Sequence, residues 1–201
     1  MVKQKNIGII ILAAGSSSRL GHPKQLVEIE GIPLLRRMAA VAVSAKCESV
    51  VVVLGAYAEK IKPVVENLAI NILINKNWET GMGSSVASGM KFLTKNHPAL
   101  EAAVLLVCDQ YHLTEEIILK LIAAFRKTGK DIVASKYGET VGVPALFSKK
   151  KFAELINLKG KSGAKKIISN KKSQIELITF EEGSFDLDVE QDLLGIKKMA
   201  S

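Results

Sequence analysis

The chain has 201 residues, 48% of them hydrophobic and 24% charged, as in an ordinary globular protein with a substantial core. No apolar run approaches 18 residues, and the first residues lack the pattern of a signal peptide, so neither a membrane span nor export is expected. Cys47 and Cys108 are far apart and form no CxxC motif, which favours a reduced, cytoplasmic setting.

The net charge of +8 is concentrated in one segment. Residues 149–172 contain nine lysines and a single acid, Glu154, so the rest of the chain is balanced. The segment has one aromatic residue, Phe152, and offers no series of stacking platforms. We therefore do not expect nucleic-acid binding; a local anionic partner and a solvated helical surface both remain open.

Apolar, β-branched runs predict strands that are buried on both faces of a sheet. In chain order they cover 7–13, 49–55, 70–75, 102–108 and 131–135. Helical periodicity predicts helices over 33–46, 84–95 and 114–127. This alternation is typical of right-handed βαβ units on a mainly parallel sheet. We predict one α/β domain over residues 1–201, with a Rossmann-like three-layer α/β/α fold and ligands at the carboxyl ends of the strands.

The last third is less regular. Residues 143–148 and 174–180 are predicted strands that add antiparallel pairing at one edge of the sheet, with Lys-rich helical sequence between them. Residues 186–198 suggest an extended piece that leads into a final helix.

The turn after the first strand reads LAAGSSSRLGHPK. Its spacing fits neither the P-loop nor the GxGxxG dinucleotide motif. The amides of its small residues can face an anion, with Arg19 as a planar fork, Lys24 as a point charge and Pro23 restricting the chain. The alternative is an ordinary Ser/Gly-rich turn whose cations are solvated.

The pattern L-A-A-G-x-S-x-R-x-G followed by P-K resembles the signature of nucleotidyltransferases that bind a nucleoside triphosphate. More closely, it is similar to the branch that transfers a nucleotide to the molybdenum cofactor, and matching motifs extend over nearly the whole chain. The resemblance implies that Arg19 and Lys24 are catalytic and hold the triphosphate. It implies nucleotide binding at Leu12, Ala13, Ala14, Gly15, Ser16, Ser17, Ser18, Arg19 and Lys24.

A second motif, NWETGMGSSVASGM at 77–90, resembles a later signature of the family. By resemblance, Gly83, Ser84 and Ser85 lie beside the base and ribose. Free amides at a helix N-terminus would suit an anionic ligand. Simple capping of the helix by Ser84 is the alternative, and the two roles can coexist.

Asp109 follows a central strand, where a carboxylate either caps the next turn or holds a hard cation such as Mg²⁺. The resemblance favours the metal, with a second carboxylate contact from Asp186 or Asp188 in FDLDVEQDL. Tyr111 stands where the family commonly has proline.

The stretch YGETVGVPALF at 137–147 resembles the family's Gly-His-Pro loop, with Val143 in place of the histidine. By resemblance, Gly142 and Pro144 bind the acceptor, and Lys165 in KGKSGAKKII meets its phosphate.

The resemblance thus implies a Mg²⁺-dependent transfer of a nucleoside monophosphate to the phosphate of molybdopterin, with release of pyrophosphate. Ala14 favours CTP over GTP as the donor, because members that use GTP have glycine there. A molybdoenzyme is one candidate recipient of the product. The alternatives are a sugar-phosphate nucleotidyltransferase of the same fold and a non-catalytic cofactor-binding or maturation protein.

Overall fold

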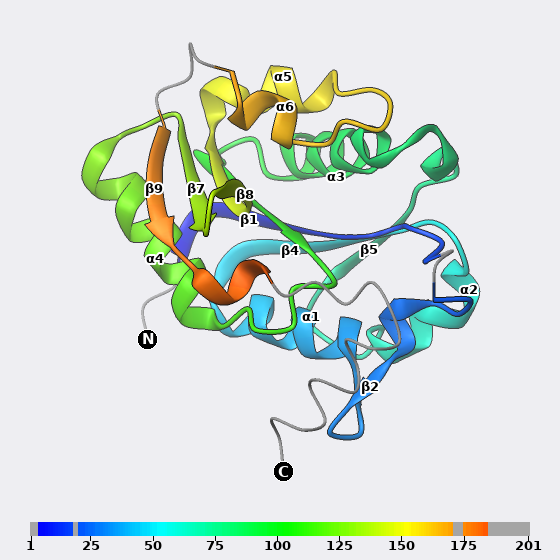
Figure 1. Cartoon of the computed structure of the whole chain (residues 1–201). Helices are drawn as coiled ribbons and strands as arrows, with labels where there is room; N and C mark the ends of the chain where they lie inside the picture. Colours follow the sequence, from blue (N-terminus) through cyan, green and yellow to red (C-terminus); the bar gives the residue numbers. More distant parts are fainter. Residues whose placement is uncertain (1–3, 18–19, 171–174, 185–201) are drawn as a thin grey trace.

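The computed structural model of the chain describes residues 4–17, 20–170 and 175–184 (Figure 1). Four predicted site residues, Ser18, Arg19, Asp186 and Asp188, lie outside these ranges. The helix expected within 186–198 also lies outside them.

A seven-stranded sheet with the order β5-β4-β1-β6-β8-β7-β9 forms the centre of the molecule. Its strands are β1 (Gln4–Ala13), β4 (Cys47–Leu54), β5 (Asn71–Ile74), β6 (Ala102–Val107), β7 (Ile132–Tyr137), β8 (Thr140–Ser148) and β9 (Ile175–Thr179). A separate hairpin pairs β2 (Glu28–Ile29) with β3 (Ile32–Pro33). All neighbouring strands of the large sheet are parallel except β8, which is antiparallel to both β6 and β7.

Helices cover both faces of this sheet, as Figure 1 shows. The helices are α1 (Leu34–Ser44), α2 (Ala58–Ile61), α3 (Met82–Asn96), α4 (Glu115–Thr128), α5 (Phe152–Ile156) and α6 (Lys165–Ile168). Side chains of β1 alternate between the two layers: Ile9 and Ile11 pack with α1 and α4, whereas Ile10 and Leu12 pack with α3. The predicted three-layer, mainly parallel architecture is confirmed.

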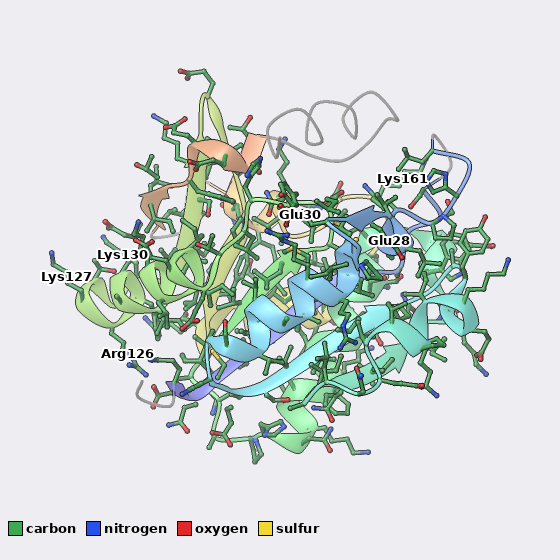
Figure 2. The ribbon with its side chains drawn as sticks, turned by 90° about the horizontal axis from the view of Figure 1, so that it is seen from below. Glu28, Glu30, Arg126, Lys127, Lys130 and Lys161 are labelled. Atoms are coloured by element: carbon green, nitrogen blue, oxygen red, sulfur yellow. The ribbon has the colours of Figure 1, made fainter. Side chains whose placement is uncertain are left out.

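Helix α4 shows how local sequence sets these elements. Glu115 and Glu116 occupy its first turn and Arg126 and Lys127 its last, so both ends complement the helix dipole. Gly129 ends the helix in the left-handed conformation with φ +63°. Figure 2 shows the basic end of α4 projecting on the opposite side of the molecule from Lys161.

The predicted antiparallel pairing is present, but it lies inside the sheet. The chain turns back at Gly138 and inserts β8 between β7 and β6, while β9 takes the edge and runs parallel to β7. Because β8 is then covered on both faces, its sequence is a continuous apolar run like those of the parallel strands.

The three central strands end at the same level. Ala13 of β1 pairs with Leu54 of β4, and Leu12 pairs with Val107 of β6. The loops that follow β1, β4 and β6 therefore emerge together at the carboxyl edge of the sheet, where open α/β sheets bind their ligands. Within the described ranges, no helix has the length and apolar character needed to cross a bilayer.

Candidate active site

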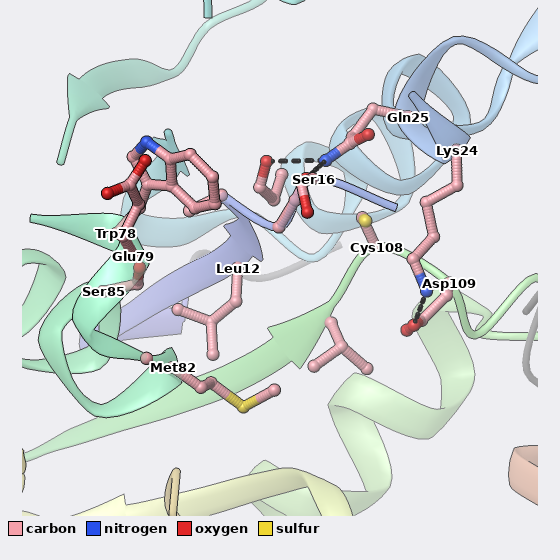
Figure 3. Close-up of a pocket in the computed structure, with 15 residues that line it drawn as sticks. Leu12, Ser16, Lys24, Gln25, Trp78, Glu79, Met82, Ser85, Cys108 and Asp109 are labelled. Carbon is pink, nitrogen blue, oxygen red and sulfur yellow. Dashed lines mark hydrogen bonds and ion pairs between the residues drawn. The ribbon is translucent and has the colours of Figure 1, made fainter. Parts of the chain in front are cut away.

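A cavity of about 340 Å³ lies at this edge (Figure 3). Its walls come from the end of β1 and the following turn, from the segment that precedes α3, and from the end of β6. The lining residues are Leu12, Ala13, Ala14, Gly15, Ser16, Lys24, Gln25, Trp78, Glu79, Gly81, Met82, Ser85, Val107, Cys108 and Asp109. We call the predicted nucleotide-binding residues 12–19, at the end of β1 and in the turn after it, the cradle. Its residues from Leu12 to Ser16 face one space, together with Lys24.

Gln25, in the 3₁₀ turn η1 (Lys24–Leu26), fixes the turn after β1, and the sequence reasoning missed it. Its side chain is 1% exposed, and its Nε2 donates hydrogen bonds to the carbonyls of Ala13 at 2.9 Å and Gly15 at 3.0 Å. The carbonyl of Ala14 accepts from the amide of Ala56 at 3.0 Å. Three successive carbonyls are therefore held by neighbouring elements, which sets the conformation of the cradle before any ligand arrives.

Lys24 and Asp109 come from loops 85 residues apart and meet in this cavity. The Lys24 Nζ lies 2.6 Å from Asp109 Oδ2, and both side chains are mostly buried, at 15% and 20% exposure. The backbone amide of Lys24 donates to Ser17 Oγ at 3.1 Å, so the lysine is anchored to the cradle. The structure thus brings Lys24, which is predicted to bind the triphosphate, into contact with Asp109, which is predicted to bind the metal.

Asp109 also has the character of a cation ligand. Its Oδ1 is buried and makes no hydrogen bond, which is costly for a carboxylate oxygen unless a ligand completes it. A hard divalent cation with phosphate and water ligands fits this oxygen. No group of three His, Cys, Asp or Glu side chains gathers in the described ranges. Among these residues, two carboxylates line the cavity, Asp109 beside Lys24 and Glu79 next to Trp78 in sequence.

Cys108, next to Asp109, takes no part in this charge pattern. It is 4% exposed and belongs to the core cluster that packs under α1 and α4. Burial, with a smaller contribution from the Asp109 carboxylate, raises the pKa of the Cys108 thiol to about 12. It therefore remains a neutral thiol at neutral pH.

Asn75 organises the second motif. Its Nδ2 donates to Ser84 Oγ at 2.8 Å and to Ser85 Oγ at 3.0 Å, and its Oδ1 accepts from the amide of Asn77 at 3.0 Å. Ser85 lines the cavity, whereas Ser84 donates to the carbonyls of Asn77 and Gly81. Helix α3 begins at Met82 with Gly81 as its N-cap and no side-chain capping bond, so capping by Ser84 is not observed.

Gly83, predicted to bind the nucleotide, packs against another loop. Its amide donates to the carbonyl of Gly160 at 3.1 Å, and a Cβ on Gly83 would lie 3.0 Å from Lys159 backbone atoms. The motif thus joins the N-terminus of α3 to the loop that carries Lys161.

A second cavity of about 640 Å³ adjoins the first. Both cavities are lined by Leu12, Met82, Val107 and Asp109. The predicted acceptor residues Gly142 and Lys165 line the second one, while Pro144 is held by its carbonyl, which accepts from Ser135 Oγ at 2.7 Å. The sequence reasoning did not single out the polar wall formed by Tyr137, Lys161, Ser162 and Lys166.

The two residues that depart from the family pattern, Val143 and Tyr111, both contact neighbouring residues of the site. Val143 lines the second cavity, and its carbonyl accepts from Gln110 Nε2 at 2.9 Å. The Tyr111 ring lies under the Arg37 guanidinium at 4.7 Å, and the Tyr111 amide donates to the Asp109 carbonyl at 3.0 Å. Val143 offers the cavity no imidazole, so any acceptor contact from this position is apolar.

The sheet order, the turn after β1 and the carboxyl edge define an α/β domain of the nucleotidyltransferase class. Residues 9–175 match the family model described as the MobA-like NTP transferase domain, and the chain belongs to this family.

Two curated relatives differ in their named activities. Nicotine blue oxidoreductase of Paenarthrobacter nicotinovorans is 33% identical over 119 residues, which cover 58% of this chain and 56% of the relative. The probable molybdenum cofactor guanylyltransferase of Trichormus variabilis is 27% identical over 130 residues, 65% of this chain and 58% of the relative. The matched part of the chain thus spans less than two thirds of the length of either protein.

Solved structures match over almost the whole chain. A homologue of Mycobacterium tuberculosis Rv0371c from Mycobacterium sp. strain JC1 is 28% identical, with a TM-score of 0.83 over 96% of this chain and 98% of that one. Rv0371c itself is 25% identical, with a TM-score of 0.84 over 98% and 100%. A manganese complex of Rv0371c, aligned at 23% identity with a TM-score of 0.79 over 96% and 98%, supports the shared fold.

Proposed function

We propose that the chain is a Mg²⁺-dependent nucleotidyltransferase that transfers CMP from CTP to the phosphate of a molybdopterin-type acceptor and releases pyrophosphate. The observation that carries this proposal is the junction of the two cavities at Asp109. A donor in the smaller cavity and an acceptor in the larger one would meet beside this carboxylate and the paired Lys24.

The proposed reaction needs little covalent catalysis by the protein. An acceptor phosphate oxygen attacks the α-phosphorus, a P–O bond forms as the bond to the β-phosphate breaks, and pyrophosphate leaves. The cradle amides and Lys24 would hold the triphosphate in line, with Arg19 as a further cation. Asp109, with Asp186 or Asp188, would hold the Mg²⁺, which supplies charge neutralisation on the phosphates when bound.

The acceptor side supports a large anionic substrate. Its cavity is nearly twice the volume of the first, and its wall combines Lys161, Lys165 and Lys166 with the phenol of Tyr137. A phosphate on the lysines and a ring system against Val141 and Val143 would match this arrangement of charged and apolar walls. The guanylyltransferase relative supports a molybdopterin acceptor, and a sugar phosphate is the alternative acceptor.

The choice of CTP rests on Ala14, which lines the donor cavity. If the base of the nucleotide lies beside Ala14, the methyl group would take space there that a glycine would leave open. We therefore propose that the smaller pyrimidine is preferred to guanine.

The test is release of pyrophosphate from CTP and GTP, with and without molybdopterin, by the wild type and an Asp109→Asn variant. We expect CTP turnover that depends on acceptor and metal, and a loss on the order of 10²-fold in Asp109→Asn. Asp131→Asn is the matched control, because Asp131 is also paired with a lysine, Lys150 at 3.2 Å, but lies outside both cavities. No turnover with any nucleotide would overturn the proposal.

The same protein separates the alternatives. Turnover with sugar phosphates but not molybdopterin would indicate the sugar-phosphate reaction. Tight cofactor binding that is unchanged by Asp109→Asn, without turnover, would indicate a maturation protein. Because one relative is named an oxidoreductase, a thermal-shift panel should include a reduced nicotinamide dinucleotide beside the four nucleoside triphosphates, each with and without Mg²⁺.

A further inference from the structure

The smaller cavity has two chemically different ends. One end holds the Lys24 Nζ and the Asp109 carboxylate. The opposite end holds the indole of Trp78 with Glu79 beside it, and Leu12 and Met82 lie between the two ends (Figure 3). A nucleoside triphosphate has the same polarity, with charge at one end and a flat aromatic base at the other. Its phosphates belong at the Lys24–Asp109 end, so its base is directed toward Trp78.

The backbone around Trp78 is fixed before any ligand binds. Trp78 lies in the 3₁₀ turn η3 (Trp78–Thr80), where its amide donates to the carbonyl of Asn75 at 3.3 Å and its carbonyl accepts from the amide of Gly81 at 3.0 Å. The Asn75 side chain in turn bonds Ser84 and Ser85 at the start of α3. The indole is therefore carried by a hydrogen-bonded turn between β5 and α3.

Gly55 lets the indole approach the strand ends. A Cβ on Gly55 would lie 2.6 Å from Trp78 Cβ and 2.7 Å from the carbonyl oxygen of Ala14. Trp78 thus packs beside the cradle on one side, while its side chain is only half-buried and lines the cavity on the other. A large aromatic surface held open to a cavity is suited to stacking on another ring.

We propose that the Trp78 indole is the stacking surface for the nucleobase of the bound nucleotide. This inference rests on the proposed function and adds a residue that positions the donor. Stacking is tolerant of base identity, since every base has a π-face. Trp78 should therefore strengthen binding of CTP and GTP by the same factor and leave their discrimination to contacts at the base edge.

The first experiment uses the fact that Trp78 is the chain's only tryptophan. Its fluorescence, excited at the red edge of its absorption, is followed during titration with CTP, GTP and inorganic tripolyphosphate in the presence of Mg²⁺. We expect both nucleotides to change the emission and tripolyphosphate, which has no base, to leave it unchanged. Equal changes with tripolyphosphate would overturn the assignment.

The second experiment measures affinity by calorimetry in Trp78→Leu and Trp78→Phe. Loss of stacking in Trp78→Leu should weaken CTP and GTP about tenfold each, with a smaller loss in Trp78→Phe and unchanged tripolyphosphate binding. Tyr57→Leu is the control, because Tyr57 is an exposed aromatic residue outside both cavities. Circular dichroism checks that each variant is folded, and Trp78→Phe keeps the test valid if Trp78→Leu is not.

The outcomes separate the two proposals. Nucleotide binding by wild type with unchanged affinity in both Trp78 variants would overturn the stacking role alone. Absence of any nucleotide binding by wild type would overturn the proposed function, and the stacking role with it.

Discussion

At the scale of single residues, the Lys24–Asp109 pair raises the question of what a ligand must displace. The ammonium occupies Asp109 Oδ2 at 2.6 Å, while Oδ1 is buried without a hydrogen bond. If Asp109 holds a metal ion as proposed, that ion and Lys24 would compete for the charge of one carboxylate when no nucleotide is present. A bound triphosphate offers Lys24 another anionic partner and the metal further oxygen ligands, so nucleotide and metal should bind cooperatively.

Replacing Lys24 by methionine tests this competition. Lys24→Met keeps the length of the side chain and removes its charge, so Mn²⁺ should bind roughly three- to tenfold more tightly without nucleotide. CTP should bind more weakly, because the triphosphate loses a cation. Free Mn²⁺ is measured by electron paramagnetic resonance, with Lys150→Met, which removes the lysine paired with Asp131, as the control. Unchanged or weaker Mn²⁺ binding in Lys24→Met would refute the competition.

Sequence reasoning at this scale assigned Lys24 and Asp109 to one site but did not predict that they contact each other. Lys24 and Asp109 were each predicted in the site, but a bond across 85 residues follows only from the sheet register that brings the ends of β1 and β6 together. Gln25 carries no recognisable pattern, because its role depends on the carbonyls of Ala13 and Gly15, which any sequence supplies. The roles of the predicted site residues stay predictions, and Arg19, Asp186 and Asp188 also lie outside the described residues.

At the scale of elements, the N-terminus of α3 is joined to the loop before α6 by glycines. Gly81 has φ +115° and ψ 171°, a region open essentially to glycine, and a Cβ there would lie 2.4 Å from the carbonyl oxygen of Gly160. This contact places the start of α3, which contributes Met82 and Ser85 to the smaller cavity, against the loop that contributes Lys161 to the larger one. The same contact between Gly81 and Gly160 therefore supports the walls of both cavities.

Gly81→Ala should break this support. Both Gly81→Ala and its control Gly160→Ala place a side chain at positive φ, but nothing lies within 4 Å of a Cβ on Gly160. We expect a cost of about 1–2 kcal/mol in Gly160→Ala and roughly 3 kcal/mol or more in Gly81→Ala, where backbone must also move. Urea unfolding gives the free energies. Equal destabilisation of the two variants would show that the contact with Gly160 is not rigid.

The strand pattern was predictable because the buried runs are long and uniform, whereas the start of α3 was not. Ser84 has the chemistry of an N-cap, yet Asn75 and two carbonyls engage its hydroxyl, and Gly81 takes the cap position. The interior position of β8 was not predicted either. Its apolar run fits a strand at the edge of the sheet as well as a central strand, and the sequence does not say which strands are its neighbours.

At the scale of the whole molecule, the described part of the basic segment, residues 149–170, divides between two edges of the sheet. Lys161, Lys165 and Lys166 line the larger cavity, where they would face the phosphate of the proposed acceptor. The three lysines of the 3₁₀ turn η4 (Lys149–Lys151) follow the end of β8, which pairs with the start of β6 at the opposite edge. The distribution of charge identifies the basic segment from the sequence. Which of its lysines line the larger cavity depends on the antiparallel direction of β8.

Stability of the whole fold should fall in alkaline solution, partly through Cys47. This thiol lies at the start of β4 and packs against the core under α1 and α4, and burial raises its pKa from 9.0 to about 12, an effect that Arg126 partly offsets. Below pH 9 the thiol is protonated in both states and contributes no pH dependence. Between pH 9 and 12 the unfolded chain releases a proton that the folded chain keeps, so unfolding becomes more favourable as pH rises.

A Cys47→Ala variant isolates this contribution. All other ionisable groups are common to both proteins, so the difference between the two unfolding free energies reports Cys47 alone. Above pH 9 the wild type should lose stability relative to the variant by at most about 1.4 kcal/mol per pH unit. Below pH 9 the two free energies of unfolding should differ by a constant amount, which reflects the packing of the Cys47 side chain. Urea unfolding at several pH values on both sides of 9 measures the two curves. Parallel curves would mean that the Cys47 thiol ionises as readily in the native protein as in the unfolded chain, and that its site is open to water.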